Sequence, residues 1–455
     1  MAKVVNTIGR SPEFWDRNVV FVANLMGLFF GNEEETQMLA DAVGEVDSYG
    51  GRLLPMLDLV YRGSGKNHLV LEREPESSLA EYFLESGLTL PEVSILSHSD
   101  YLEWGESHED HKFEEEVDSI PRKIREHSAS HLDGYVTDQI LCDLAAWSGK
   151  PTLSSPEGSR LGNNKVLLHQ HLDTLGLPTP GTELAESPED VKRCLAILRK
   201  SGYTSAVIRA AIGASGIGMV KVSSIEGEQD VPIPAHFFSE GPCLVQGWLR
   251  KGEFGIAEVH SPSVQLFVGE EEVRLYDTTE QILSSESIHE GNESPPFYMS
   301  RNRELHEEML RQAGIAGDWL HAQGYRGTGS VDFLVTRNSD GSWTVYICEI
   351  NARVTGATYP SVLARHFLPE GAWLLRNLRF HEPLPGEELL GLMRRSGDLF
   401  LPGKSDFGIF PVNFNFGKDG LVHKGQFLCL SASRLSNKML LQVAELDLPC
   451  TPERD

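Results

Sequence analysis

Apolar residues in the first third of the chain occur in short runs that alternate with helical patterns. Three runs that contain Val, Leu or Ile have the length of buried strands: 19–23, 68–72 and 92–96. Residues 77–85 and 137–147 instead place apolar side chains at helical spacing. Alternating strands and helices predict an α/β layer over residues 1–150.

The pattern then changes to helices followed by a hairpin. Residues 161–175 predict a helix with Lys165 near its start. Ser187 and Pro188 begin a second helix that runs to about residue 200, because Ser caps helices well and Pro is favoured at their first position. A strand, a glycine-rich loop and another strand follow.

The second half of the chain adds strands around one long helix. The predicted elements are strands at 244–246 and 254–259, a helix at 302–323, and a hairpin of 330–336 with 344–350. Residues 291–300 predict either a lid over a site or an ordinary surface loop. Gly, Pro and Phe clusters after residue 385 predict a small C-terminal domain, so the expected units are 1–150, 151–385 and 386–455.

Composition narrows the classes of partner. The chain has 455 residues and a formal charge of −26, which argues against binding to nucleic acid or to an anionic membrane surface. The longest apolar stretch, near 19–30, is too short to span a membrane. The six cysteines form no C-x-x-C pair, so reduced thiols and a cytoplasmic location are expected.

The most informative chemistry lies on the predicted hairpin. Glu349 and Asn351 are two residues apart at the end of an apolar strand and therefore share a face. Asp332 lies on the partner strand. Two carboxylates and an amide oxygen suit a hard cation, so these three residues predict a magnesium site that bridges to phosphates. The alternative is that they are polar strand ends that make turn hydrogen bonds.

The glycine-rich loop is a candidate phosphate-binding element. Arg209 ends the strand at 206–210, and a strand rather than a helix follows at 219–222, so the loop is not a Rossmann fingerprint. Its backbone amides and glycines permit a close approach to phosphate. The candidate residues are Gly213, Ser215, Gly216, Ile217 and Gly218. The alternative is a simple turn.

A connector after the strand at 244–246 is a candidate adenine site. Its backbone groups suit adenine, and Glu253 suits the hydroxyls of a ribose. The connector residues are Gln246, Gly247, Trp248 and Leu249. The alternative is an ordinary strand end.

The order of these features along the chain resembles the ATP-grasp superfamily of carboxylate–amine ligases. The resemblance covers residues 150–370 and implies ATP and Mg²⁺ held between two α+β subdomains. The magnesium set of that superfamily matches Asp332, Glu349 and Asn351, and a catalytic arginine matches Arg353. Its two lysines match Lys165 and position 209.

Two residues depart from that pattern. Position 209 is Arg rather than Lys, which keeps the charge but changes the geometry offered to phosphate. Ser330 stands where some members carry an arginine, so Arg353, Arg301 or Arg303 would supply the positive charge.

The regions on either side of the core resemble peptide ligases of the pheganomycin type, which have an N-terminal pre-ATP-grasp domain and a small C-terminal domain. This implies that a small carboxylic acid, such as a guanidino amino acid, is activated as an acyl phosphate. The acid would then join the N-terminal amine of a peptide acceptor in antibiotic biosynthesis, with a homodimer as one possible assembly. The alternatives are an amino-acid or dipeptide ligase with small substrates, and a non-catalytic ATP-binding module.

Overall fold

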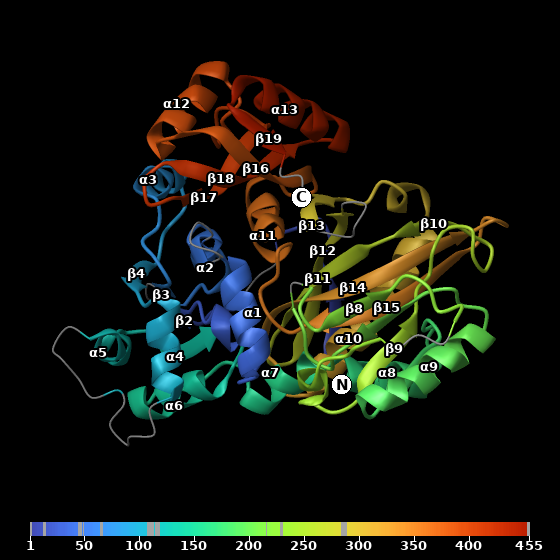
Figure 1. Ribbon diagram of the computed structural model, residues 1–455. Coiled ribbons are helices and arrows are strands. Elements are labelled where there is room, and N and C mark those ends of the chain that lie inside the picture. The colour runs from blue at the N-terminus through green and yellow to red at the C-terminus, as the bar shows by residue number, and fades with distance from the viewer. Residues whose placement is uncertain are drawn as a thin grey trace.

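The structure is a computed structural model of the chain. It describes residues 2–11, 15–43, 48, 50–63, 67–106, 113, 119–214, 216–227, 231–283 and 289–452. Within these residues the strands form one large mixed sheet and two sheets of four strands (Figure 1).

The N-terminal region is an α/β layer, as the sequence predicted. Its parallel sheet has the order β4-β3-β2-β5, with strands β2 (Val19–Val22), β3 (His68–Leu71), β4 (Glu92–Ile95) and β5 (His131–Gly134). Strand β5 was not predicted, because its short sequence contains a His, an Asp and a Gly. The accompanying helices are α1 (Glu33–Val43), α2 (Leu57–Val60), α3 (Ser77–Glu85), α4 (His98–Glu106), α5 (Ile120–Glu126) and α6 (Gln139–Ser148), with 3-10 turns η1 (Leu25–Gly27) and η2 (Gly50–Leu53).

The small antiparallel sheet contains the predicted glycine hairpin. Its order is β6-β9-β7-β8, with strands β6 (Thr182–Ala185), β7 (Ala206–Arg209), β8 (Met219–Val222) and β9 (Cys243–Gly247). Helix α9 (Pro188–Lys200) buries one side against this sheet, and η3 (Ala235–Phe238) precedes β9.

The single helix predicted at 161–175 is two helices, α7 (Pro156–Gly162) and α8 (Lys165–Thr174). The break has a local cause. The side chain of Asn164 accepts hydrogen bonds from the backbone N–H groups of Val166 and Leu167 and so caps α8. Lys165 is therefore the first residue of a helix that starts afresh.

The large sheet contains strands from both ends of the chain and from its middle. Its path is β10-β14-β11-β12-β13-β16-β18-β17, and β1, β15 and β19 pair beside β12, β14 and β16. The bounds are β1 (Lys3–Asn6), β10 (Ile256–His260), β11 (Pro262–Val268), β12 (Glu272–Leu283), β13 (His289–Ser294), β14 (Gly327–Asn338), β15 (Trp343–Asn351), β16 (Ala372–Leu384), β17 (Gly408–Phe416), β18 (Val422–Ser431) and β19 (Cys450–Pro452).

Helices cover this sheet on both sides. Helix α10 buries an apolar side against β11, β12 and β15, with η4 before it. The remaining helices lie near β16 to β18 (Figure 1). Their bounds are η4 (Met299–Arg301), α10 (Arg303–Ala322), α11 (Thr358–Phe367), α12 (Gly386–Ser396) and α13 (Arg434–Asp447). Because β1 and β16 to β19 join the same sheet as β10 to β15, the units 1–150, 151–385 and 386–455 stay a prediction.

The prediction of a lid or a surface loop at 291–300 is wrong for residues 291–294. Residues 291–294 belong to β13, which is buried between β12 and β16. Gly291 allows this close pairing, because an added Cβ would lie 2.2 Å from the carbonyl oxygen of Leu375.

Gly291→Ala is therefore expected to destabilise the protein by about 1–3 kcal/mol, since β16 must shift to make room for the methyl group. Thermal unfolding measures the change. The matched control is Gly269→Ala in the turn between β11 and β12, where an added Cβ has ordinary contacts of 3.4 Å. Equal melting temperatures for the two variants would contradict this account of β13.

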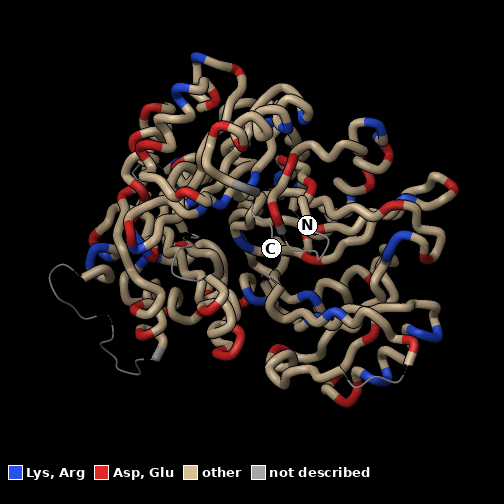
Figure 2. The backbone as a smooth tube through the Cα atoms, turned by 45° about the horizontal axis from the view of Figure 1, so that its top comes forward, with Lys and Arg blue, Asp and Glu red and all other residues tan. Residues whose placement is uncertain are grey.

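Two broader expectations can be compared with the structure. All six cysteines are free thiols. No helix in the described ranges is long and apolar enough to cross a membrane. Asp and Glu positions are distributed along the backbone throughout the described part of the chain (Figure 2).

Candidate functional site

The predicted site residues meet where the small sheet approaches strands β14 and β15 of the large sheet (Figure 1). Arg209 at the end of β7 forms an ion pair with Glu349 on β15, and it also donates to the carbonyl oxygen of Cys348 at 3.1 Å. Lys165 Nζ lies 3.4 Å from the same Glu349 carboxylate. The contact between the two sheets is therefore made by the residues proposed to hold phosphate and magnesium.

A β-bulge on β15 presents the predicted metal ligands. Asp332 is paired with Glu349, but the next pair is Phe333 with Ile347, so Cys348 is an extra residue. The bulge changes the alternation of faces. Ile347 packs in the core under α10, whereas Glu349 faces the small sheet.

Hydrogen bonds hold the other two members of the magnesium set. Asn351 Nδ2 lies 3.0 Å from Asp332 Oδ2, and Ser330 Oγ donates to Asp332 Oδ1 at 3.1 Å. Gln281 Nε2 approaches Asp332 Oδ2 at 3.5 Å. The serine that replaces an expected arginine thus supports a candidate ligand instead of supplying charge.

Charge is distributed unevenly over the carboxylate pair. Burial alone would raise the pKa of Glu349, but Lys165, Arg209 and Arg353 lower that pKa to about 2. Burial and the neighbouring Glu349 charge raise the pKa of Asp332 to about 7. Burial also lowers the pKa of the Lys165 ammonium to about 8. Asp332 is therefore the half-buried carboxylate of the pair whose charge the neighbouring cations compensate less.

The donor set fits magnesium. Asp332 and Glu349 supply carboxylate oxygens, and the side-chain amide of Asn351 supplies a third oxygen once its orientation is reversed. A divalent cation here would also remove the cost of burying two neighbouring carboxylates. Elsewhere in the described part of the chain, no cluster of three or more His, Cys, Asp or Glu side chains is able to hold a metal.

Arg353 is fixed by a residue that sequence reasoning missed. Its Nη1 donates to Asn163 Oδ1 at 2.6 Å, and the backbone N–H of Ala352 donates to the same oxygen at 3.1 Å. Asn163 lies in the break between α7 and α8, and no sequence signal ties it to Arg353. Arg301 and Arg303 do not serve as alternatives, since both are exposed and Arg303 pairs with Glu307.

The glycine loop follows β7 and adjoins Lys165. Lys165 Nζ donates to the carbonyl oxygen of Gly213 at 3.1 Å. Gly216 and Gly218 have φ angles of 82° and 78°, which favour glycine. Ile217 and Ala214 pack against the apolar core that the N-terminal region shares with β16 to β18. The remaining candidate residue of this loop, Ser215, lies outside the described residues.

The predicted adenine connector is only partly joined to this cluster. Gln246 Oε1 accepts a hydrogen bond from Arg209 Nη1 at 3.4 Å, whereas Gly247 packs on Tyr203. Leu249 is buried, and the ring of Trp248 faces the Lys221 ammonium at 5.2 Å. These contacts leave Gln246 nearest to the phosphate residues.

Glu253 lies at the other end of the connector. It accepts a hydrogen bond from Thr204 Oγ1 at 2.5 Å and lies 3.3 Å from Arg250 Nε. Its Oε2 is buried and has no hydrogen-bond partner among the described residues. A buried acceptor without a donor fits the proposed contact with a ribose hydroxyl.

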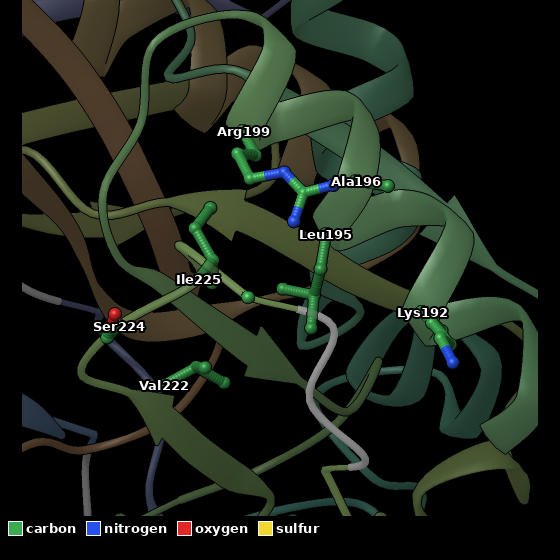
Figure 3. Close-up of a pocket in the computed structure, with 8 residues that line it drawn as sticks. Lys192, Leu195, Ala196, Arg199, Val222, Ser224 and Ile225 are labelled. Carbon is green, nitrogen blue, oxygen red and sulfur yellow. The ribbon is translucent and has the colours of Figure 1, made fainter.

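A cavity of about 50 Å³ lies away from this cluster, between α9 and the segment after β8 (Figure 3). Leu195, Val222 and Ile225 line it, and Lys192 and Arg199 stand at its edge. It contains none of the predicted site residues, so it is not the candidate site.

Comparisons with known proteins agree with the fold. No protein-family profile matches the chain. The [butirosin acyl-carrier protein]–L-glutamate ligase of Niallia circulans is 29% identical over 178 residues, which is 38% of this chain and 38% of that ligase. The chain therefore matches well under half the length of that curated relative.

Two solved structures extend the comparison to the whole chain. N5-carboxyaminoimidazole ribonucleotide synthetase in complex with ADP has a TM-score of 0.53 at 12% identity, covering 95% of this chain and 97% of that one. The biotin carboxylase domain of Hydrogenobacter thermophilus 2-oxoglutarate carboxylase, with MgADP and bicarbonate, has a TM-score of 0.55 at 11% identity, covering 96% and 91%. Both are ATP-grasp proteins, so the chain has the ATP-grasp fold that the sequence predicted.

Proposed function

We propose that the chain is an ATP-dependent carboxylate–amine ligase that forms an acyl phosphate and releases ADP. One observation carries this proposal. The half-buried pair Asp332 and Glu349 lies among the three cations Lys165, Arg209 and Arg353. A site that combines oxygen ligands for a metal with several fixed cations suits a triphosphate.

The elements around this cluster support a position for the nucleotide. Adenine would lie along the connector from Gln246 to Leu249, with its ribose toward Glu253 and its phosphates beneath the glycine loop. Asp332, Glu349 and Asn351 would hold Mg²⁺ against the phosphates, where the metal neutralises charge on the phosphate oxygens. The ADP and MgADP complexes of the two similar structures support this placement.

The residues of the chain then favour transfer of the γ-phosphoryl group. A substrate carboxylate oxygen attacks the γ-phosphorus, the bond to the β-phosphate oxygen breaks, and ADP leaves with that electron pair. Lys165, Arg209 and Arg353 stabilise the negative charge that spreads over the transferring group, an electrostatic contribution that is often the largest in such reactions. Asn163 positions Arg353 for this role.

The proposal extends to the substrates. The donor is a small carboxylic acid of amino-acid type, and the acceptor is the N-terminal amine of a peptide in natural-product biosynthesis. The regions flanking the core resemble peptide ligases, and the name of the curated relative includes L-glutamate as a substrate of that enzyme. That name equally favours a second candidate, a ligase for small amino acids. A non-catalytic module is disfavoured, because such a module needs no intact carboxylate set.

Measurement of ADP release tests the proposal. The purified chain is incubated with ATP, Mg²⁺, one acid and one amine, where the acids are L-glutamate, L-arginine and L-phenylglycine and the amines are glycine and tetraglycine. ADP and phosphate are expected only when acid and amine are both present. Formation of AMP and pyrophosphate, or no turnover with any pair, would refute ligase activity of this type. If glycine but not tetraglycine serves as the amine, the peptide acceptor is rejected.

A further inference from the structure

A buried glutamate of the N-terminal region lies against the glycine loop. Glu35 is in the first turn of α1, and 3% of its surface is exposed. Within the described part of the chain, its Oε1 has no hydrogen-bond partner. The same oxygen lies 3.2 Å from the position that a Cβ on Gly218 would occupy. The carboxylate therefore stands beside the loop proposed to cover the phosphates.

Neighbouring contacts fix α1 in this position. Glu34 Oε2 lies 2.5 Å from His236 Nδ1, and Asn32 Nδ2 donates to Ser239 Oγ at 3.2 Å. The glycine loop packs on the same region through Ile217. Asn32 and Glu34, directly before Glu35, thus tie the start of α1 to η3 and the segment that precedes β9.

The charges around Glu35 do not satisfy it. Burial raises its pKa to about 7, the positive charges of His236 and Lys165 act to lower that pKa, and Glu240 acts to raise it. Glu240 itself is engaged by Arg160 at 2.7 Å. A buried carboxylate without a hydrogen bond requires a donor or a proton.

The proposed reaction supplies such a donor. The phosphates and the reacting carboxylate of the acid are anions and would be repelled by Glu35. The acceptor amine arrives as an ammonium with three N–H donors, and it must lose a proton before it attacks the acyl carbon. An amino-acid donor carries an ammonium as well, but its nitrogen need not lose a proton for the reaction, so the acceptor ammonium is the group that best matches a carboxylate able to take a proton.

We propose that Glu35 binds the ammonium of the acceptor and takes its proton. This inference rests on the proposed ligase function. One N–H proton passes to Glu35 Oε1, and the freed electron pair on nitrogen attacks the acyl carbon. The C–N bond forms, and the C–O bond to phosphate breaks with its electron pair on the phosphate. The second N–H proton leaves with phosphate as hydrogen phosphate, and Glu35 returns its proton to water.

Hydroxylamine separates this step from acid activation, because it is already neutral at pH 7 and needs no base. Each variant is assayed with tetraglycine and with hydroxylamine, using ATP, Mg²⁺ and whichever of the three acids gives the most hydroxamate with the wild type. Glu35→Gln is expected to lower transfer to tetraglycine by at least about 100-fold while hydroxamate formation stays within about twofold. Raising the pH toward the amine pKa should reduce the deficit.

Two variants guard against a structural explanation. Glu35→Asp keeps a carboxylate and should recover part of the transfer to tetraglycine. Glu33→Gln, an exposed residue of the same helix turn, should behave as wild type. An equal loss with both nucleophiles, or no loss with tetraglycine, would overturn the proposed role of Glu35 but not the ligase function. A wild-type enzyme that forms no hydroxamate with any acid would refute the ligase function as well.

Discussion

Glu349→Ala should lower acid-dependent ADP release by about 100- to 1,000-fold, because it removes a candidate magnesium ligand and the counter-charge of Lys165 and Arg209. The fold should survive. With Glu349 gone, the pKa of Asp332 falls, and one buried carboxylate remains for the nearby cations. Initial rates at saturating ATP measure the first effect, and thermal unfolding measures the second.

The control belongs to the same hairpin. Asp340→Ala removes only hydrogen bonds to Ser342 in the exposed turn between β14 and β15, so its rate should match the wild type. A near-normal rate for Glu349→Ala would make the central assignment of the site wrong. Loss of the folded state in Glu349→Ala but not in Asp340→Ala would show that Glu349 is mainly structural.

Asp277→Ala should have the largest effect on stability, about 3–5 kcal/mol, since it leaves a buried arginine without its counter-charge. Asp277 on β12 accepts hydrogen bonds from Arg365 Nη2 at 2.8 Å, Trp373 Nε1 at 2.9 Å and Ser294 Oγ at 2.9 Å. These partners lie on α11, β16 and β13. One carboxylate therefore joins three strands of the large sheet, β12, β13 and β16, to helix α11.

Denaturant unfolding of wild type and variant measures this free energy. The control is Arg303→Ala, which breaks an exposed ion pair with Glu307 and should leave the unfolding midpoint unchanged. If Asp277→Ala shifted the midpoint no more than the control does, the buried network would not be what holds β12, β13, β16 and α11 together.

Local spacing was enough to predict much of the fold and the core of the site. Short apolar runs identified three of the four parallel strands, a period of 3.6 residues identified helices, and glycine-rich or turn-rich loops marked the two hairpins, because each of these signals is local. The pairing of Asp332 with Glu349 also follows from one hairpin, so it needs no knowledge of distant contacts.

The remaining features depend on contacts between distant segments. Asn163 contacts Arg353 across 190 residues, and Glu35 reaches the glycine loop from helix α1 of the N-terminal region. The bulge at Cys348 follows from strand pairing rather than from its own residue type. The segment after Gly291 resembled a loop in sequence, but β12 and β16 on either side make it a buried strand.

The pairing of β1 with β12 has a consequence for folding while the ribosome synthesises the chain. Thr7 bonds to the carbonyl of Leu275, 268 residues later in the chain. At ~5–20 residues per second, a ribosome needs on the order of tens of seconds to produce that partner. During this time β1 lacks its partner strand β12, and the large sheet cannot be completed. Completion of the sheet that carries Asp332 and Glu349 is therefore expected to be a late event in folding.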